Sequence, residues 1–230
     1  MLRLDHLALR QGDFTLTADW SLAPGARLAL IGPSGAGKST LLAGIAGFLP
    51  PERGRILWQE DDITPIAPGK RPVAMLFQDG NLFPHLSIER NVGLGLRPDL
   101  RLSGAERDRV CAALARVGLE GLADRKPGNL SGGQQSRAAL ARVLVMNRPL
   151  LLLDEPFAAL GPAMRAEMLD LVAEMAGETG TTLIMVSHDP GDAQRIAGLT
   201  SVVAEGRAAA PVETGALFAN PTEALRDYLG

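Results

Sequence analysis

A chain of 230 residues suits one large domain, or one core with a subdomain, and a hydrophobic content of 46% can supply that core. The formal net charge of −3 argues against the basic face that broad nucleic-acid binding requires, so we expect no nucleic-acid partner. The single cysteine, Cys111, excludes an internal disulfide and favours a reducing compartment. Because it lies in a run of alanines at helical spacing, we expect it to pack in the core.

The first residues of the chain, 1–13, alternate apolar and polar side chains and carry charge throughout. This pattern predicts a strand and not a signal peptide. No apolar run approaches the roughly 20 residues that a membrane-spanning helix needs. We therefore expect a soluble, cytoplasmic protein that can still dock on a membrane partner.

A continuous apolar run at residues 27–32 predicts a buried parallel strand, which a glycine-rich turn and a helical pattern follow. The turn matches G-x-x-x-x-G-K-[ST], a loop that holds phosphate groups with backbone N–H groups and the positive end of a helix. In this loop Lys38 is expected to contact the outer phosphates, Ser39 to bind Mg²⁺ and Thr40 to support the loop. The matching residues are Gly32, Pro33, Ser34, Gly35, Ala36, Gly37, Lys38, Ser39 and Thr40.

Residues 85–146 follow a helical pattern with breaks at Pro98 and Gly128, which predicts a helical subdomain inserted into the sheet core. Ser103 and Glu106 have the S-x-x-E spacing of a capping box. A helix is therefore expected to begin after Ser103.

Two further apolar runs, at residues 150–154 and 181–188, predict parallel strands, and ligands of such sheets bind at the carboxyl ends of the strands. The first of these runs leads into Asp154 and Glu155. In proteins with this kind of phosphate loop, a second buried strand delivers a carboxylate to the Mg²⁺ shell, and Asp154 has that position. Glu155 is a candidate general base for the water that attacks the γ-phosphate.

The segment after these acids predicts a helix that begins at Pro162, because proline suits the first helical position. Apolar residues then recur at helical spacing and predict one buried face. They are Met164, Met168, Leu171, Val172 and Met175.

Three further motifs narrow the class of nucleotide-binding protein. Residues 129–135 read NLSGGQQ, Gln78 lies in LFQDGNLF, and His188 lies in VSHDP. Together with the phosphate loop and LLLLDEP, these motifs occur in the order typical of ATP-binding cassette (ABC) ATPases, which the chain resembles over essentially its whole length. The resemblance implies an α/β fold: a P-loop NTPase (RecA-like) core, an N-terminal antiparallel β subdomain and an inserted helical signature subdomain.

The same resemblance implies a domain organisation and a set of site residues. Residues 1–230 would form one nucleotide-binding domain, with a catalytic core at 1–84 and 147–230 and the helical subdomain at 85–146. ATP and Mg²⁺ are the implied cofactors. The implied catalytic residues are Glu155, His188 and Gln78, and the implied metal ligands are Ser39, Gln78 and Asp154. His188 would contact the γ-phosphate, and Gln78 would reach the metal or the attacking water.

The signature motif implies a second chain. Its residues at a helix N-terminus can bind an anion through N–H groups and a hydroxyl. In the family two copies pack head-to-tail, so that each signature closes over the ATP of the other copy. The implied arrangement is a homodimer with ATP between its subunits. The signature residues are Ser131, Gly132, Gly133 and Gln134.

The stretch after Gln78, residues 79–85, faces a membrane subunit in ABC importers of this family. Leu82, Phe83 and Leu86 are apolar enough to line such a contact, although core packing is the alternative. Residues 70–96 above all resemble the ATP-binding subunits of bacterial thiamine importers.

The resemblance to these importers implies a subunit that hydrolyses ATP to power import of thiamine or its phosphates. Its partners would be permease subunits and, indirectly, a periplasmic solute-binding protein. The subunit would be located at the cytoplasmic face of the inner membrane. Two alternatives stay open: a soluble regulatory ABC protein with weak hydrolysis, and an importer ATPase for iron, sulfate or a polyamine.

Two positions depart from the family pattern. The aromatic residue that stacks on adenine would fall near Gln11, which is not aromatic, and Phe14 or Trp20 are the nearby alternatives. The family also has an aspartate where this chain has Gly161, so the contact that this aspartate makes across the dimer is missing.

Overall fold

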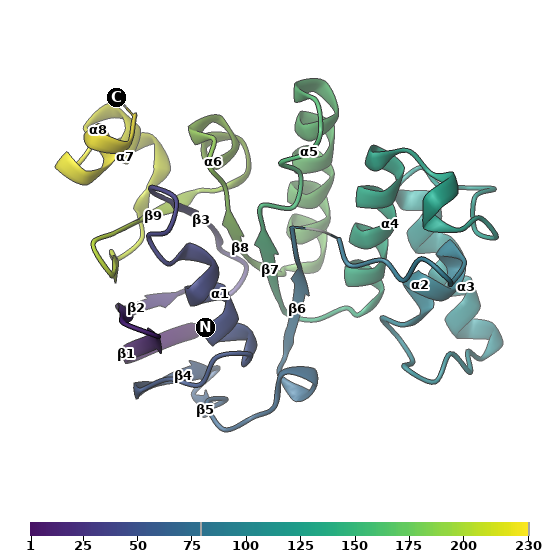
Figure 1. Cartoon of the computed structure of the whole chain (residues 1–230), viewed down its shortest axis with the longest axis horizontal. Coiled ribbons are helices and arrows are strands. Elements are labelled where there is room, and N and C mark those ends of the chain that lie inside the picture. The colour runs from purple at the N-terminus through teal and green to yellow at the C-terminus, as the bar shows by residue number, and fades with distance from the viewer. Residues whose placement is uncertain (79, 230) are drawn as a thin grey trace.

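The structure is a computed structural model that describes residues 1–78 and 80–229 (Figure 1). Its first part is antiparallel: β1 (Leu2–Gln11) pairs with β2 (Phe14–Leu22) on one side and with β4 (Arg53–Trp58) on the other. The short β5 (Asp61–Asp62) pairs with β4. Among the described residues, no helix combines the length and the apolar character that crossing a membrane requires.

The centre of the molecule is a parallel sheet in the order β9, β3, β8, β7, β6. It joins the antiparallel strands through β10 (Arg207–Ala208), and β11 (Val212–Glu213) pairs with β9. The three apolar runs predicted as strands are β3, β7 and β8, and β6 and β9 complete the parallel part. Their bounds are β3 Arg27–Ile31, β6 Val73–Leu76, β7 Leu150–Asp154, β8 Thr182–Val186 and β9 Leu199–Ala204.

The strands of the parallel sheet are buried on both faces because successive side chains point to opposite sides. In β7, Leu151 and Leu153 join a core formed with the helices that follow the strands, whereas Leu150 and Leu152 join a second core with α1 (Lys38–Ala46) and the antiparallel strands. This double burial explains why these runs are continuously apolar.

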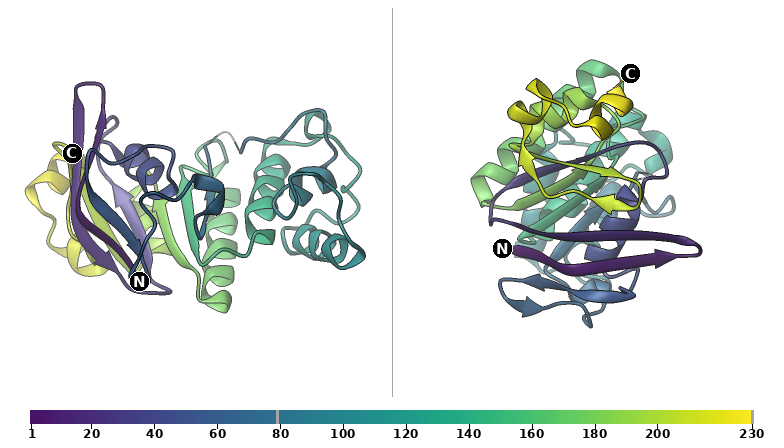
Figure 2. Two further views of the ribbon diagram at one scale, coloured as in Figure 1. Left: turned by 90° about the horizontal axis from the view of Figure 1, so that it is seen from below. Right: turned by 90° about the vertical axis from the view of Figure 1, so that its left-hand side faces the viewer.

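The helices form two groups (Figures 1 and 2). One group surrounds the sheet. Besides α1, it comprises α5 Pro162–Thr179, α6 Pro190–Ile196, α7 Thr214–Ala219 and α8 Glu223–Leu229. The other group lies beside the sheet edge, past β6. It comprises α2 Ile88–Gly93, α3 Gly104–Arg116 and α4 Gly132–Val145, with a 3₁₀ turn at Pro127–Asn129 before α4. A further 3₁₀ turn, Pro68–Lys70, precedes β6.

The predicted helix starts are confirmed. Ser103 caps α3 in a capping box with Glu106, and Pro162 is the first residue of α5. The α/β fold class is likewise confirmed, with antiparallel strands at the start of the chain and helices inserted after β6.

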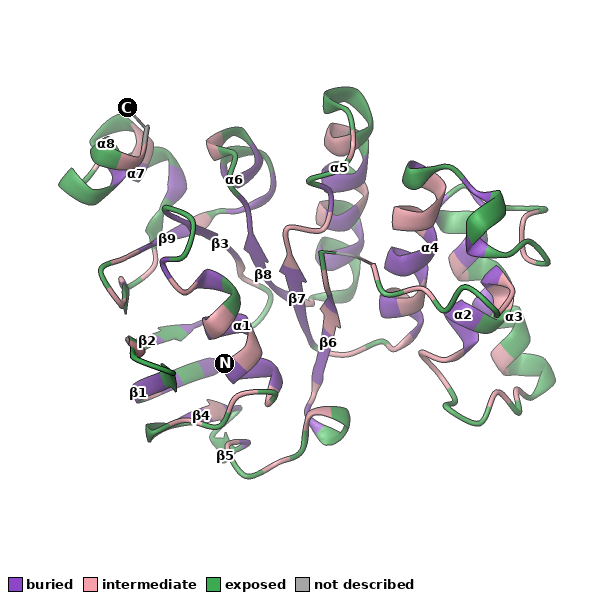
Figure 3. Ribbon diagram, viewed as in Figure 1, coloured by how far each residue is buried: buried purple, intermediate pink, exposed green. Residues whose placement is uncertain are grey.

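Two burial predictions are wrong. Cys111 is exposed, because it follows the buried Val110 by one residue and so lies about 100° around the helix from the packed face. Met164 is 37% exposed and contacts Gly133 of α4, whereas Met168, Val172 and Met175 form the buried face of α5 as predicted. Figure 3 shows α5 with both buried and exposed residues along its length. The predicted core stripe therefore begins at Met168.

Candidate functional site

The phosphate loop runs from the end of β3 to the start of α1, and close approaches explain its glycines. Gly32 has φ +145°, and a Cβ there would lie 2.0 Å from the carbonyl oxygen of Val203. Gly37 has φ +101°, and a Cβ there would lie 2.8 Å from the ring of Phe14. Side chains at either position would collide with the wall of the loop, so the curled backbone depends on glycine.

Lys38 is held by the loop that it serves. Its side chain is buried, and its Nζ donates hydrogen bonds to the carbonyl oxygens of Gly32 at 2.7 Å and Pro33 at 2.8 Å. Burial lowers the pKa of Lys38, and the carboxylates of Glu155 and Asp154 partly oppose this shift. The ammonium group of Lys38 therefore lies near the carboxylates of Glu155 and Asp154. Its unbranched side chain can rotate toward a bound anion.

Ser39 and Asp154 bring two oxygens together from different elements. The Ser39 Oγ donates to Asp154 Oδ1 at 2.9 Å. Burial raises the pKa of Asp154, the bond from Ser39 lowers it, and the neighbouring Glu155 raises it further. A hydroxyl and a partly buried carboxylate are hard oxygen ligands, so these residues fit the Mg²⁺ that the sequence predicts. Thr40 lies beside them and donates to Gln11 Oε1 at 3.3 Å.

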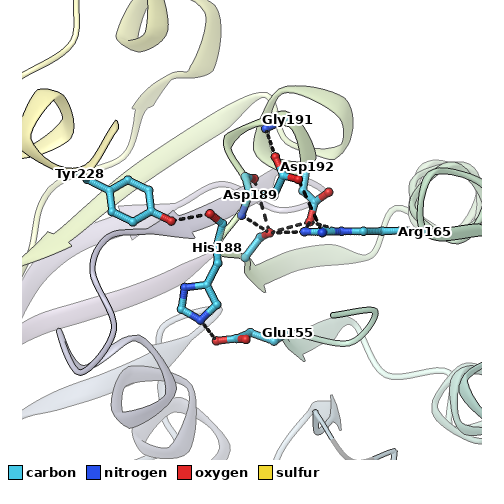
Figure 4. Close-up of polar contacts among 8 residues, drawn as sticks. Glu155, Arg165, His188, Asp189, Gly191, Asp192 and Tyr228 are labelled. Atoms are coloured by element: carbon cyan, nitrogen blue, oxygen red, sulfur yellow. Dashed lines mark hydrogen bonds and ion pairs between the residues drawn. The ribbon is translucent and has the colours of Figure 1, made fainter. Parts of the chain in front are cut away.

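Glu155 turns away from Asp154 because its backbone is left-handed, with φ +46°. Such a conformation is costly for a non-glycine residue and persists only where the surroundings impose it. Here the Glu155 N–H donates to the carbonyl oxygen of Val186 at 3.2 Å. The carboxylate, 15% exposed, contacts Nε2 of His188, whose side chain is 45% exposed (Figure 4). Asp154 thus contacts Ser39 of the phosphate loop, and Glu155 contacts His188.

Lys38, Ser39, Thr40, Glu155 and His188 line one pocket of about 340 Å³, and Asp154 reaches its edge through Ser39. The pocket therefore unites the phosphate loop with Glu155, His188 and the turn between β1 and β2. Its lining consists of Gln11, Phe14, Ser34, Gly35, Gly37, Lys38, Ser39, Thr40, Glu155 and His188. Trp20, one of the alternatives for adenine stacking, is buried in the core of the antiparallel strands and cannot meet a ligand. Gln11 and Phe14 remain beside the loop.

Gln78 lies elsewhere. It is exposed and lines a separate pocket of about 600 Å³ between its own loop and the start of α4. Asp79, within the predicted partner stretch, is outside the described residues. Of the three apolar residues in that region, Phe83 is 46% exposed, while Leu82 and Leu86 are half-buried. Leu82 also packs against the core, so Phe83 is the most exposed of these three apolar side chains.

The signature residues begin α4. Ser131 is the N-cap: its Oγ accepts from the Gln134 N–H at 3.3 Å, and the Gln134 Oε1 accepts from the Ser131 N–H at 3.0 Å. This is a second capping box, and the S-x-x-Q spacing signals it in the sequence. Ser131 and Gly132 are exposed, and Gly133 lies under Met164. Within residues 1–78 and 80–229, the phosphate-loop pocket includes no signature residue.

A charged network behind His188 was not predicted. Asp192, at the start of α6, accepts from Ser187 Oγ and from Arg165 Nε, the latter at 3.0 Å. Arg165 Nη1 also lies 3.5 Å from Asp189 Oδ2. The sequence does carry a signal for this network: Arg165 precedes the buried Leu169 by one helical turn, and a charge on a buried stripe needs a partner.

A strand, a glycine-rich loop and a helix N-terminus, with an acidic residue at the end of a neighbouring parallel strand, define a P-loop nucleotide-binding protein. Within that class the assignment is specific. Residues 16–158 match the family model described as "ABC transporter", and the chain belongs to this family.

Its relatives and structural neighbours agree. The chain is 64% identical over 230 residues to the "Thiamine import ATP-binding protein ThiQ" of Cereibacter sphaeroides, with all of both chains covered. It is 49% identical over 227 residues to the protein of that name from Yersinia pestis, covering 99% of this chain and 93% of the relative.

Among solved structures, the ADP conformation of the ATP-binding cassette MJ1267 aligns with a TM-score of 0.88 and 25% identity, covering 100% of this chain and 98% of that one. A dimeric post-hydrolysis state of the cassette MJ0796, bound to ADP and Pi, aligns with a TM-score of 0.82 and 28% identity. That alignment covers 93% of this chain and 99% of the other.

Proposed function

We propose that this chain binds and hydrolyses ATP to power a membrane importer for thiamine or its phosphates. The observation that carries the hydrolytic part is the contact between Glu155 and His188 in the pocket that also holds Lys38 and Ser39. The cargo rests on the 64% identity to a relative named for thiamine import.

Binding begins at the phosphate loop. Its backbone N–H groups and the N-terminus of α1 receive the phosphates, and Lys38 leaves the carbonyls of Gly32 and Pro33 for the outer phosphates. Ser39 and Asp154 would hold Mg²⁺, which when bound neutralises charge on the phosphates. Gln11 and Phe14 lie where the nucleoside would leave the pocket.

Hydrolysis uses the two residues at the other wall. Glu155 takes a proton from water as the water oxygen bonds to the γ-phosphorus, while the bond from that phosphorus to the β–γ bridging oxygen breaks and ADP leaves. The side chain of Glu155 is 15% exposed and faces this pocket. His188 orients the Glu155 carboxylate and, once nucleotide is present, contacts the γ-phosphate. Gln78 joins this site only if its loop approaches the phosphate loop, so we propose that nucleotide brings the two pockets together.

The signature residues act on a second copy. Ser131 and Gly132 are exposed at the N-terminus of α4, away from the phosphate loop of their own chain. We propose a head-to-tail homodimer in which they close over the partner's ATP. The neighbour MJ0796 is described as dimeric with ADP and Pi bound.

The remaining surface would meet the transporter. We propose a catalytic core at residues 1–84 and 147–230 and a helical subdomain at 85–146. The loop around the exposed Phe83 would dock on permease subunits at the cytoplasmic face of the inner membrane. A periplasmic solute-binding protein would act on this chain only through the permease.

Reconstitution into liposomes tests the proposal. With the permease and a thiamine-loaded binding protein, ATP turnover is expected to rise several-fold over that with the empty binding protein. A loaded protein for iron, sulfate or a polyamine is the matched control. Stimulation by the control alone would overturn the thiamine assignment.

The test also separates a second candidate, a regulatory protein with weak hydrolysis. Gly161 favours that alternative, because the N-cap of α5 carries no side chain to reach a partner. Failure to turn over ATP under any of these conditions would support the regulatory role.

A further inference from the structure

The peptide unit that follows His188 is held at both of its polar ends (Figure 4). Its N–H, which belongs to Asp189, donates to Ser187 Oγ at 3.0 Å. Its carbonyl oxygen, which belongs to His188, accepts a hydrogen bond from the hydroxyl of Tyr228. Because a peptide unit is planar, two such contacts restrict its rotation and with it the direction in which the His188 side chain leaves the backbone.

The contact on the N–H side lies within residues 187–192. Ser187 is buried and bonded to Asp192, which Arg165 of α5 in turn contacts. These groups lie within a few residues of His188 or on the adjacent helix. These contacts fix Ser187 and the Asp189 N–H, but none of them involves the carbonyl oxygen of His188.

The contact on the carbonyl side comes from a distant part of the chain. Tyr228 lies on α8, forty residues after His188. Leu225, one helical turn earlier, is fully buried in the core and anchors this face of α8. The ring of Tyr228 packs against the same core, which restricts the position of its hydroxyl beside the His188 carbonyl.

The hydroxyl is a dependable donor. Burial, followed by the nearby carboxylates of Asp189 and Glu155, raises the pKa of the Tyr228 phenol above its usual value. Since an unperturbed tyrosine titrates near pH 10, this group keeps its proton throughout the neutral range.

We propose that Tyr228 is a positioning residue for ATP hydrolysis: its hydroxyl holds the carbonyl of His188, so that the imidazole stays directed at Glu155. The inference rests on the proposed function, because it gives Tyr228 a role only if Glu155 and His188 perform the hydrolysis. It also makes α8 part of the catalytic apparatus, although no residue of α8 lines the phosphate-loop pocket in the described part of the chain.

The variant Tyr228→Phe removes the hydroxyl and keeps the ring. Loss of one neutral hydrogen bond should reduce kcat about 2- to 10-fold, while KM for ATP changes less than about twofold. The matched control is Asp227→Asn, an exposed position on the same helix, which should leave both constants unchanged. An unchanged kcat in Tyr228→Phe, or a loss confined to KM, would overturn the proposal.

A double-mutant cycle asks whether Tyr228 acts through His188. In a His188→Ala background, adding Tyr228→Phe should produce no further loss, because there is no imidazole left to orient. An equal further loss would mean that the hydroxyl only stabilises the fold, and would contradict the positioning role.

Glu155→Gln, measured alongside, distinguishes failure of the positioning role of Tyr228 from failure of the proposed base, Glu155. Loss of turnover in Glu155→Gln together with a normal Tyr228→Phe refutes the positioning role alone. Normal turnover in Glu155→Gln refutes the proposed base, and with it the proposed mechanism.

Discussion

The phosphate loop and the loop after Gln78 are attached to different parts of the molecule. Lys38 and Glu155 are held by carbonyls of the sheet strands and of the turn that follows β3. The backbone of residues 80–83 is instead held by side chains of the helical group. Lys38 and Glu155 are therefore attached to the sheet, and residues 80–83 are attached to the helices.

Side chains of Arg142 and Asn91 attach the backbone of residues 80–83 to the helical group. Arg142 of α4 donates to the carbonyl oxygens of Gly80 at 2.6 Å and Asn81 at 2.7 Å. Asn91 of α2, fully buried, accepts from the Phe83 N–H at 2.7 Å and donates to its carbonyl oxygen at 3.0 Å. Gln78 stands at the boundary, so a shift of the helices relative to the sheet alters its distance from the phosphate loop. Substitutions on either side of this boundary test how far the two loops are independent.

The largest expected effect is on the sheet side, at Arg165. Arg165→Ala leaves Asp192, whose side chain is 11% exposed, without its guanidinium partner, and should cost about 2–3 kcal/mol of unfolding free energy. Urea denaturation measures the loss. Arg195→Ala is the control: both partners of its ion pair with Asp170 are exposed, so its loss should be much smaller than that of Arg165→Ala. Equal losses in the two variants would contradict a buried anchor behind His188.

Arg142→Ala tests the helical side. It removes both donors that hold Gly80 and Asn81, and should cost about 1–2 kcal/mol locally. Hydrogen exchange of residues 80–86 should then accelerate about tenfold, while residues 32–40 keep their protection. The exposed Arg107 of α3 supplies the control, as Arg107→Ala. Acceleration in the phosphate loop as well would mean that the two loops form one unit.

Asp154 should show a trade-off between function and stability. Its folded-state pKa is raised by burial, so the ionised carboxylate destabilises the fold above that pKa, and stability rises as pH falls through it. Asp154→Asn should therefore stabilise the Mg²⁺-free chain at neutral pH, by about 1 kcal/mol, and weaken Mg²⁺-dependent turnover.

Thermal unfolding at pH 7 and pH 5 measures this trade-off. The gap between Asp154→Asn and the unsubstituted chain should narrow at the lower pH. A gap that widens on acidification would reverse the sign of the pKa shift.

The smallest effect is expected at Gly161. It is the N-cap of α5, has φ −64°, and has open space around its Cα, so an aspartate fits without strain. Gly161→Asp should add a few tenths of a kcal/mol through capping. It should also tighten communication between the two ATP sites, seen as higher cooperativity in ATP. Unchanged cooperativity and turnover would mean that the missing aspartate has no importance here.

Local signals account for what the sequence predicts well. The phosphate loop, the strand that ends at Asp154, and the capping box at Ser103 each depend on neighbours in the chain, so their residue patterns suffice. The second capping box, at Ser131, carries the same kind of local signal in its S-x-x-Q spacing.

Long-range contacts explain what the sequence does not predict. Tyr228 contacts His188 because α8 packs beside β9, and the two residues are too far apart in the sequence for any local pattern to predict the contact. Trp20 and Cys111 illustrate the limits of local signals. The aromatic ring of Trp20 suggested a ligand contact, and the alanine-rich surroundings of Cys111 suggested burial, but Trp20 is buried and Cys111 is exposed. Side-chain direction is fixed by the element, not by the residue type.

The central claim is that Glu155 activates the attacking water, and one measurement tests it most directly. Glu155→Gln keeps the shape of the side chain but removes its basicity, so the variant should bind ATP, accumulate as a dimer by light scattering, and lose turnover about 100-fold or more. ATP turnover equal to that of the unsubstituted chain would contradict the account.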